Sequence, residues 1–298
     1  MLFLLCGLVV LASCAGAAEA PSGTRVVLLG TGNPNPDPDR MGPATAVVVN
    51  GTAYLVDAGA GVMRRAEQAR RAGIEALDAR RIGFVFLSHL HSDHTMGLPD
   101  LIHTGWVAER DRALQLFGPP GTSAMATHLT EAYEADIANR TSGLQPHTPE
   151  GWRVEATEVT GGLVFRDSNV TVTAIPVPHD GWAVSLAYRF ETRDRVVVIS
   201  GDTRPSDALV EACNGCDLLI HEVYSVKGFA ARSPEWQKYH ADAHTSAAEL
   251  AALATRARPK LLVLYHQLFM GGTDAELLAE VRKGYGGVVV SGRDLGIY

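Results

Sequence analysis

The segment from His89 to His94 reads HLHSDH and places three histidines and one aspartate within six residues. Neutral imidazole and ionised carboxylate are good ligands for Zn²⁺ and similar divalent ions. The tight spacing lets His89 and His91 point to one side of a turn, while Asp93 and His94 point toward a neighbouring position. A lone histidine is usually a satisfied core or surface residue, but this cluster predicts a metal site. One loop of this kind can supply ligands to two metals.

Three further ligand-type residues each follow an apolar stretch: His179 in VPHD, Asp202 in SGDT and His266 in LYHQ. The carboxylate of Asp202 can bridge two cations through its two oxygens, and Gly201 before it favours a turn that exposes the side chain. Two divalent ions about 3.5–4 Å apart clamp both sides of a displacement and activate a water between them. These residues therefore predict the remaining ligands of a two-metal hydrolytic site.

Predicted strands position these side chains, because the strong apolar runs end near polar residues, namely Asp57, His89, His179, Asp202, His221 and His266. In layered α/β folds, functional residues gather at strand ends along one edge of the sheet. The run IGFVFLSH, which leads into the histidine cluster, is continuous and apolar and predicts a buried strand. The sequence therefore predicts one site built from the ends of several strands.

The rest of the chain alternates strands and helices, and no internal repeat is evident. Asn50-Gly51 lies between two apolar runs and is the strongest short signal for a β-hairpin. Helices are predicted to begin at Pro205 and to cover residues 61–72, 122–137, 245–257 and 273–285. This alternation is typical of a layered α/β fold.

The chain resembles the metallo-β-lactamase superfamily, whose signature is the HxHxDH loop, and within it the tRNase Z branch and its arylsulfatase-like relatives. The resemblance covers about residues 25–298 and rests, in chain order, on GTGNPNP, VDAGAG, SHLHSDHTMGLPDL, VPHD, SGDT, HEVY, AHTSAAELAALA and LVLYH. It implies a four-layer αβ/βα sandwich, with two sheets face to face and helices outside. It also implies one hydrolase domain over residues 21–298.

The resemblance assigns a role to each candidate ligand. It implies a first metal on His89, His91 and His179, a second metal on Asp93, His94 and His266, and a bridge at Asp202. The expected cofactors are two Zn²⁺ ions, with Mn²⁺ or Fe²⁺ as alternatives. A hydroxide between the metals would attack the ester.

Glu222 and His244 resemble the acid and histidine that this branch uses to protonate a leaving group. The resemblance implies that His244 is the general acid and that Glu222 orients it and raises its pKa. Asp93 is counted as catalytic as well as ligating. The alternative interpretation makes Glu222 a helix-start carboxylate and His244 a neighbour of an N-cap.

The remaining histidines are interpreted as structural or exposed, and His240 as solvated at the rim; they are His103, His128, His147, His221 and His240. Trp182 and Tyr224 lie close in sequence to candidate site residues. Either ring can stack on an aromatic leaving group, although packing is the favoured interpretation for both.

Residues 1–20 form an apolar leader followed by small residues, which predicts a signal peptide and an exported protein. LASC, which ends at Cys14, also resembles a lipobox, so ordinary cleavage and lipidation at Cys14 both stay open. The expected location is the periplasm or the outer membrane in a bacterium, and the medium otherwise. Cys213 and Cys216 are compatible with a disulfide, a zinc half-site or two reduced thiols.

Substrate class is inferred from size and charge. Only 22 residues separate His179 from Asp202, which leaves no room for the long arm by which the tRNase Z family grips tRNA. The formal net charge of −7 also counts against a general nucleic-acid binder. The expected substrate is therefore a small sulfate ester or phosphodiester, with nucleic acid unlikely and a homodimer expected by analogy. The alternatives are a tRNase Z-like 3′-processing endoribonuclease, a lactonase or β-lactamase, and a non-catalytic binding protein.

Overall fold

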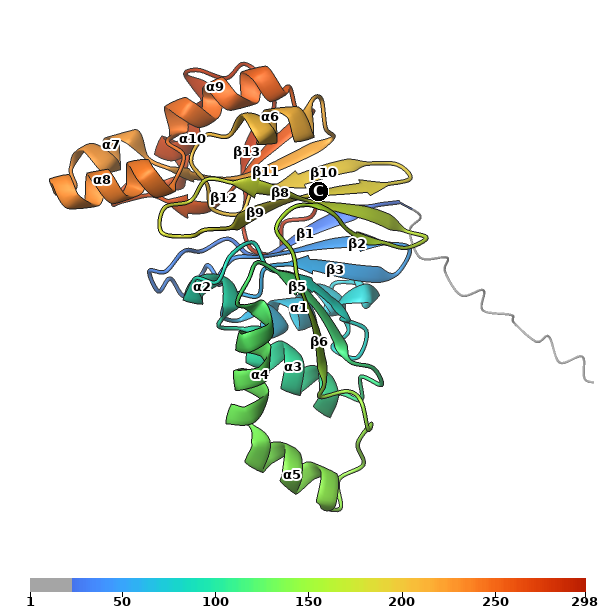
Figure 1. Cartoon of the computed structure of the whole chain (residues 1–298). Coiled ribbons are helices and arrows are strands. Elements are labelled where there is room, and N and C mark those ends of the chain that lie inside the picture. The colour runs from blue at the N-terminus through green and yellow to red at the C-terminus, as the bar shows by residue number, and fades with distance from the viewer. Residues whose placement is uncertain (1–22) are drawn as a thin grey trace, which may run out of the picture.

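A computed structural model describes residues 23–298, so the leader and Cys14 lie outside the described residues. Two β-sheets lie face to face, with helices on both outer sides (Figure 1). The first sheet has six strands in sequence order: β1 (Arg25–Gly30), β2 (Ala44–Val49), β3 (Thr52–Val56), β4 (Phe84–Phe86), β5 (Leu114–Gly118) and β6 (Val154–Glu158). This arrangement confirms the expected αβ/βα sandwich.

The second sheet has seven strands, which run in reverse sequence order from β13 across to β7. They are β7 (Gly162–Arg166), β8 (Val170–Val177), β9 (Ser185–Thr192), β10 (Val196–Ile199), β11 (Leu218–Tyr224), β12 (Leu261–Leu268) and β13 (Val289–Ser291). Strands β3 to β6 pair in parallel in the first sheet, and β10 to β13 do so in the second. Parallel strands present their carboxyl ends at one edge, which is where loops with polar residues meet.

The predicted hairpin is confirmed between β2 and β3, which pair as antiparallel neighbours. Asn50 has φ 48° and Gly51 has φ 79°, so both central residues occupy the left-handed region. A type I′ turn requires positive φ at both positions, which Asn and Gly tolerate best. The turn fixes the register of the first sheet's antiparallel edge.

Apolar side chains fill the space between the sheets, because both sheets turn one face inward. Large aromatic rings dominate this layer, and Phe86 packs edge-on against Tyr188 at 5.6 Å and Phe190 at 5.7 Å. Outside the first sheet lie α1 (Val62–Arg71) and α3 (Leu98–Val107), and outside the second lie α6 (Asp207–Cys213), α9 (Ala247–Ala257) and α10 (Asp274–Arg282) (Figure 1).

Two regions differ from the sequence prediction. The helix predicted over 122–137 is two helices, α4 (Thr122–Ala132) and α5 (Glu134–Ser142), separated at Tyr133, and the pair projects from the body of the molecule (Figure 1). The segment after β11 was not predicted as helical, yet it forms α7 (Val226–Ala230) and α8 (Pro234–Ala243). The short elements are η1 (Glu75–Leu77) and α2 (Ser92–Thr95).

Cys213 and Cys216 form a disulfide at the end of α6, and both sulfurs face the core under the second sheet. The sequence left a disulfide, a zinc half-site and two reduced thiols open, and the structure contains the disulfide. Within residues 23–298, none of the helices is long and apolar enough to cross a bilayer.

Candidate metal centre

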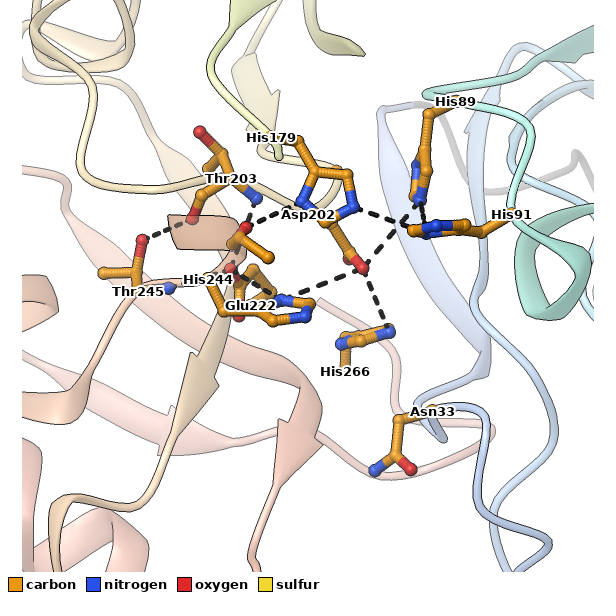
Figure 2. A network of polar contacts seen from close by, with 12 residues as sticks. Asn33, His89, His91, His179, Asp202, Thr203, Glu222, His244, Thr245 and His266 are labelled. Carbon is orange, nitrogen blue, oxygen red and sulfur yellow. Dashed lines mark hydrogen bonds and ion pairs between the residues drawn. The ribbon is translucent and has the colours of Figure 1, made fainter. Parts of the chain in front are cut away.

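The histidine loop leaves the end of β4 and turns into α2, which begins directly after His91. The Nε2 atom of His89 lies 2.8 Å from Nδ1 of His91, and Nε2 of His179 lies 3.3 Å from the same Nδ1. His179 reaches this point from the loop after β8, on the opposite sheet (Figure 2). Three ring nitrogens therefore converge on one point, in the arrangement expected for three ligands of one cation.

A second cluster lies beside the first. Asp93 Oδ2 lies 3.5 Å from His94 Nε2 and 3.3 Å from His266 Nε2. Asp202 Oδ2 lies 3.4 Å from each of these two nitrogens and 4.0 Å from His89 Nε2. Asp202 therefore stands between the clusters, as a bridging carboxylate would. The structure brings together all seven residues to which the sequence assigned a ligand role.

These side chains fit divalent cations on chemical grounds. Among the described residues, the buried atoms His94 Nε2 and Asp202 Oδ1 have no hydrogen-bond partner. Buried polar atoms without a partner are rare, because their desolvation is not compensated. Bound cations would satisfy them, and a donor set of imidazoles and carboxylates is typical of zinc. The clusters are therefore able to bind metal, while the identity of the ion stays a prediction.

Neighbouring groups fix the ring orientation of two histidines. His94 donates from Nδ1 to Asp57 Oδ2 at 2.8 Å, which leaves Nε2 free to bind a cation. Asp57 in turn accepts hydrogen bonds from the backbone and hydroxyl of Ser88, at 2.7 and 2.9 Å. His179 donates from Nδ1 to the Ala243 carbonyl at 2.7 Å. The sequence marked Asp57 only as a polar strand end, and its orienting role depends on a contact across 37 positions.

Charge is distributed unevenly over the second cluster. Burial lowers the pKa of His94, but the carboxylates of Asp202, Asp57 and Asp93 outweigh burial and hold that pKa well above its usual value. Burial raises the pKa of Asp202, yet His266 and His94 hold it well below its usual value. The raised pKa of His94 means that a cation at its Nε2 atom competes with a proton.

The first cluster has the opposite character. Burial lowers the pKa of His89, His91 and His179, and neighbouring histidines lower it further. The three rings are therefore neutral near pH 7, which is the form that ligates a metal. This cluster is ready to accept a cation without first losing protons.

His244 and Glu222 lie together at the inner side of the site (Figure 2). His244 Nδ1 lies 3.3 Å from Glu222 Oε1 and 3.9 Å from Asp202 Oδ2. Glu222 is fully buried, and its Oε1 accepts hydrogen bonds from the backbone of Thr203 at 3.2 Å and of Thr245 at 3.0 Å. Burial lowers the pKa of His244, but the charge of Glu222 outweighs burial and raises it. The pair thus favours a protonated imidazole beside the metal ligands.

A cavity of about 1030 Å³ opens over both groups. Its floor includes His91, Asp93, Asp202, His244 and His266. Its walls come from the proline-rich loop of residues 32–40, from α8 and from the loop after β12. A substrate of considerable size therefore has access to the ligands and to His244 together.

Besides His244, three histidines outside the ligand set are buried, namely His103, His221 and His240. His240 is only 7% exposed, so the expectation that it is solvated at the rim was wrong; its ring packs against Trp236 and Tyr239 on α8. His221 is fully buried and its Nδ1 bonds the carbonyl of Glu222, in agreement with a structural role.

The two aromatic residues that the sequence singled out do not line the cavity. Tyr224 is buried and stacks on Phe229 at 5.0 Å, so it serves packing. Trp182 donates from its indole nitrogen to His91 Nε2 at 3.1 Å. Three other aromatic residues line the cavity, namely Trp236, Tyr239 and Phe269, and none of them was predicted from the sequence.

Comparison with known proteins places this geometry in a family. The family model described as a beta-lactamase superfamily domain matches residues 39–267. The chain belongs to the metallo-β-lactamase superfamily. Within this superfamily, it is 36% identical over 279 residues to a protein named Ribonuclease Z from Mycobacterium marinum, with 91% of this chain and 96% of the relative covered. A Ribonuclease Z from Mycobacterium bovis is 35% identical over 276 residues, and 91% of this chain is covered.

Solved structures of the superfamily agree in fold. Human tRNase Z, short form, superposes with a TM-score of 0.68 at 23% identity, covering 92% of this chain and 98% of that one. The metallo-beta-lactamase fold protein YhfI from Bacillus subtilis superposes with a TM-score of 0.67 at 18% identity, covering 92% of this chain and 98% of that one. These superpositions support the fold.

The expectation that nucleic acid is an unlikely partner was wrong, because the relatives that this chain resembles are named Ribonuclease Z. The alignment with the Mycobacterium marinum protein covers 96% of that relative and 91% of this chain. A protein named Ribonuclease Z therefore also lacks a long insertion relative to this chain, so a missing arm is no argument against an RNA substrate. Net charge was equally uninformative, because it sums over the whole surface and does not report the charge near one cleft. The arylsulfatase-like interpretation finds no support among these relatives.

Proposed function

We propose that this protein is a metal-dependent endoribonuclease of the ribonuclease Z type, which hydrolyses a phosphodiester bond in RNA. The observation that carries the proposal is the position of the His244–Glu222 pair beside the ligand clusters. Nδ1 of His244 lies 3.9 Å from the carboxylate of Asp202, and His244 lines the same cavity as the ligands. The identity of 36% to a protein named Ribonuclease Z supports the RNA substrate.

Seven side chains would hold two divalent cations in this protein: His89, His91 and His179 for one, Asp93, His94 and His266 for the other, and Asp202 for both. Cations at these positions would neutralise phosphate oxygens and lower the pKa of water. Asp57 and the Ala243 carbonyl keep the ligating nitrogens of His94 and His179 turned toward the site. The protein thus presents a preorganised anion-binding floor.

His244 supplies the proton that the departing oxygen needs. Glu222 Oε1 faces Nδ1 of the ring, so the Nε2 proton of the imidazolium remains available to the leaving group. Two backbone amides hold Glu222, which prevents it from swinging away as the charge on the ring changes. General acid catalysis of this kind contributes about 10²–10⁴-fold to the rate.

Substrate panels with purified, metal-quantified protein test this function. We expect cleavage of a structured RNA that carries a 3′ extension, loss of cleavage after chelation, and recovery on adding back Zn²⁺ or Mn²⁺. Asp202→Ala serves as the inactive control. Hydrolysis of aryl sulfates or lactones by the same preparation, with intact RNA, would overturn the proposal.

We also propose that the protein acts outside the cytosol. The leader at residues 1–20 and the Cys213–Cys216 disulfide both support export, since disulfides persist mainly in oxidising compartments. Fractionation of cells that express the full chain or a chain without residues 1–20 provides the test. Equal amounts of both forms in the cytosol would contradict export.

A further inference from the structure

Helix α8 carries two aromatic side chains on the cavity wall. Trp236 is 54% exposed and Tyr239 is 36% exposed, and both line the same cavity as Asp202 and His244. Exposure of apolar ring surface to water costs about 25 cal/mol for each Å². Two adjacent aromatic rings that remain open to a catalytic cavity are therefore candidates for contact with a substrate.

The rings form a continuous series from the metal ligands to the rim. His266 stacks on His244 with ring centroids 5.8 Å apart and planes 21° apart. Tyr239 packs edge-on against His244 at 5.9 Å, and Trp236 packs edge-on against Tyr239 at 5.8 Å. The exposed rings thus lie beyond His244 in the cavity that also contains the proposed proton donor.

Neighbouring side chains hold the rings of Trp236 and Tyr239, and helix α8 itself, in place. The buried ring of His240 stacks on Trp236 at 5.6 Å with planes 24° apart. Pro234 lies in the first turn of α8, where its fixed φ suits a helix start. Gln237 donates to the carbonyls of Phe229 and Arg232 at 3.3 and 3.0 Å, which ties α8 to α7. A ring that is already fixed loses little entropy when a ligand stacks on it.

This wall carries one cation that suits a nucleotide phosphate, and one carboxylate beside it. Arg232 lines the cavity, and within residues 23–298 its guanidinium has no carboxylate in ion-pair contact. Glu235 also lines the wall, at the start of α8, where hydrogen bonds from Ser233 and its own backbone lower its pKa. Aromatic rings combined with a free cation are the usual means by which proteins bind unpaired nucleotides.

We propose that Trp236 and Tyr239 stack on the base of the nucleotide whose oxygen departs, and that Arg232 contacts the phosphate backbone beside it. This proposal rests on the proposed ribonuclease function and adds a base-binding subsite to it. Stacking on every base is similar, so the subsite selects an unpaired nucleotide rather than a sequence. The enzyme would therefore prefer to cut RNA at a junction where a single strand leaves a duplex.

The test uses two RNA substrates that differ only in the base of the leaving nucleotide, which is present in one and abasic in the other. With metal-loaded protein, the double variant Trp236→Ala/Tyr239→Ala should lose roughly 10- to 100-fold in kcat/KM on the intact RNA, mainly through KM. It should lose less than about threefold on the abasic RNA. Trp236→Phe/Tyr239→Phe should retain most of the activity, because the rings remain.

Controls separate the subsite from the overall fold and from the proposed function. Tyr133→Ala removes an aromatic residue that is 41% exposed and lies away from the cavity, and should leave both substrates unaffected. Arg232→Gln should lower kcat/KM equally on both RNAs, since the phosphate is present in each. Equal losses by the double alanine variant on both RNAs, or none on either, would overturn the subsite. Failure of the wild-type protein to cut any RNA would instead overturn the proposed function.

Discussion

The two halves of the cleft are built in different ways. The first sheet supplies four candidate ligands from one short segment, which comprises the end of the loop after β4 and helix α2. The second sheet supplies single residues from separate elements, spread over almost ninety positions: His179, Asp202, Glu222, His244 and His266. Local chain geometry thus organises one half, and packing of distant elements organises the other.

The supports of the two halves differ as well. In the first half, side chains orient the ligands, as Asp57 does for His94 with the help of Ser88. In the second half, the backbone does so, as the Ala243 carbonyl does for His179. The first half is therefore dedicated to holding metal, whereas the second adds the bridge, the proton donor and the substrate wall. Substitutions in each half should consequently have distinguishable effects.

The largest effect is expected where the halves meet, at Asp202. Asp202→Ala removes the oxygen that lies 3.4 Å from both His94 Nε2 and His266 Nε2, so metal content and activity should fall together. We expect a decrease in kcat of at least about 10³-fold. Metal analysis after dialysis, alongside RNA cleavage, measures both. Asp207→Ala is the matched control, because Asp207 makes only an exposed ion pair with Arg256; an active Asp202→Ala protein with full metal content would refute the bridging role.

A smaller effect confined to the second half is expected at His244. His244→Ala should keep both metals, because the seven ligands remain, yet slow cleavage about 10²–10⁴-fold. Substrates with poor leaving groups should suffer most, since they need the proton most. Rates on an alkyl and a 4-nitrophenyl phosphodiester provide the comparison, with the exposed His128→Ala as control. Wild-type rates on the alkyl ester would rule out the general acid.

The supports of the first half are tested at Asp57. Asp57→Asn keeps the side-chain shape and tolerates the φ of 62° at this position, but weakens the bond to His94 Nδ1. Loss of such a partner typically lowers metal affinity by about 10- to 100-fold. Chelator competition should show one weakened metal and one unchanged metal. Asp294→Asn, which alters another well-buried carboxylate, is the control; equal weakening of both metals would show that Asp57 does not act through His94 alone.

Much of the first half could be predicted from the sequence, because its information is local. The ligands lie within one loop, and the Asn50-Gly51 turn requires only its own two φ angles. The later ligands, His179, Asp202 and His266, each follow an apolar strand and lie in short motifs that occur in order along the chain. Residues that can be recognised from their immediate sequence neighbours can therefore be predicted without a structure.

The wall of the second half was not predictable, because it depends on tertiary packing. Helices α7 and α8 lack a clean apolar stripe, so their side chains gave no periodic signal. The ring of His240 packs against Tyr224 of β11 as well as against its own helix, and the orientation of His94 depends on Asp57. The substrate was misjudged for the same reason, since net charge and chain length are properties of the whole chain and recognition belongs to one wall.

The smallest effect expected is a pH dependence of stability in the second half, through His240. Burial, together with the charges of His244 and Arg232, lowers the pKa of His240 from 6.5 to about 4. Between these values the unfolded chain binds a proton that the folded protein does not, so the free energy of unfolding falls as the pH falls from about 6.5 to 4. His240→Phe keeps a ring against Trp236 and removes this proton. Urea unfolding at pH 7 and pH 4.5 should therefore show that the wild-type protein loses about 2 kcal/mol more than the variant; equal losses would mean that His240 already carries its charge in the folded wall.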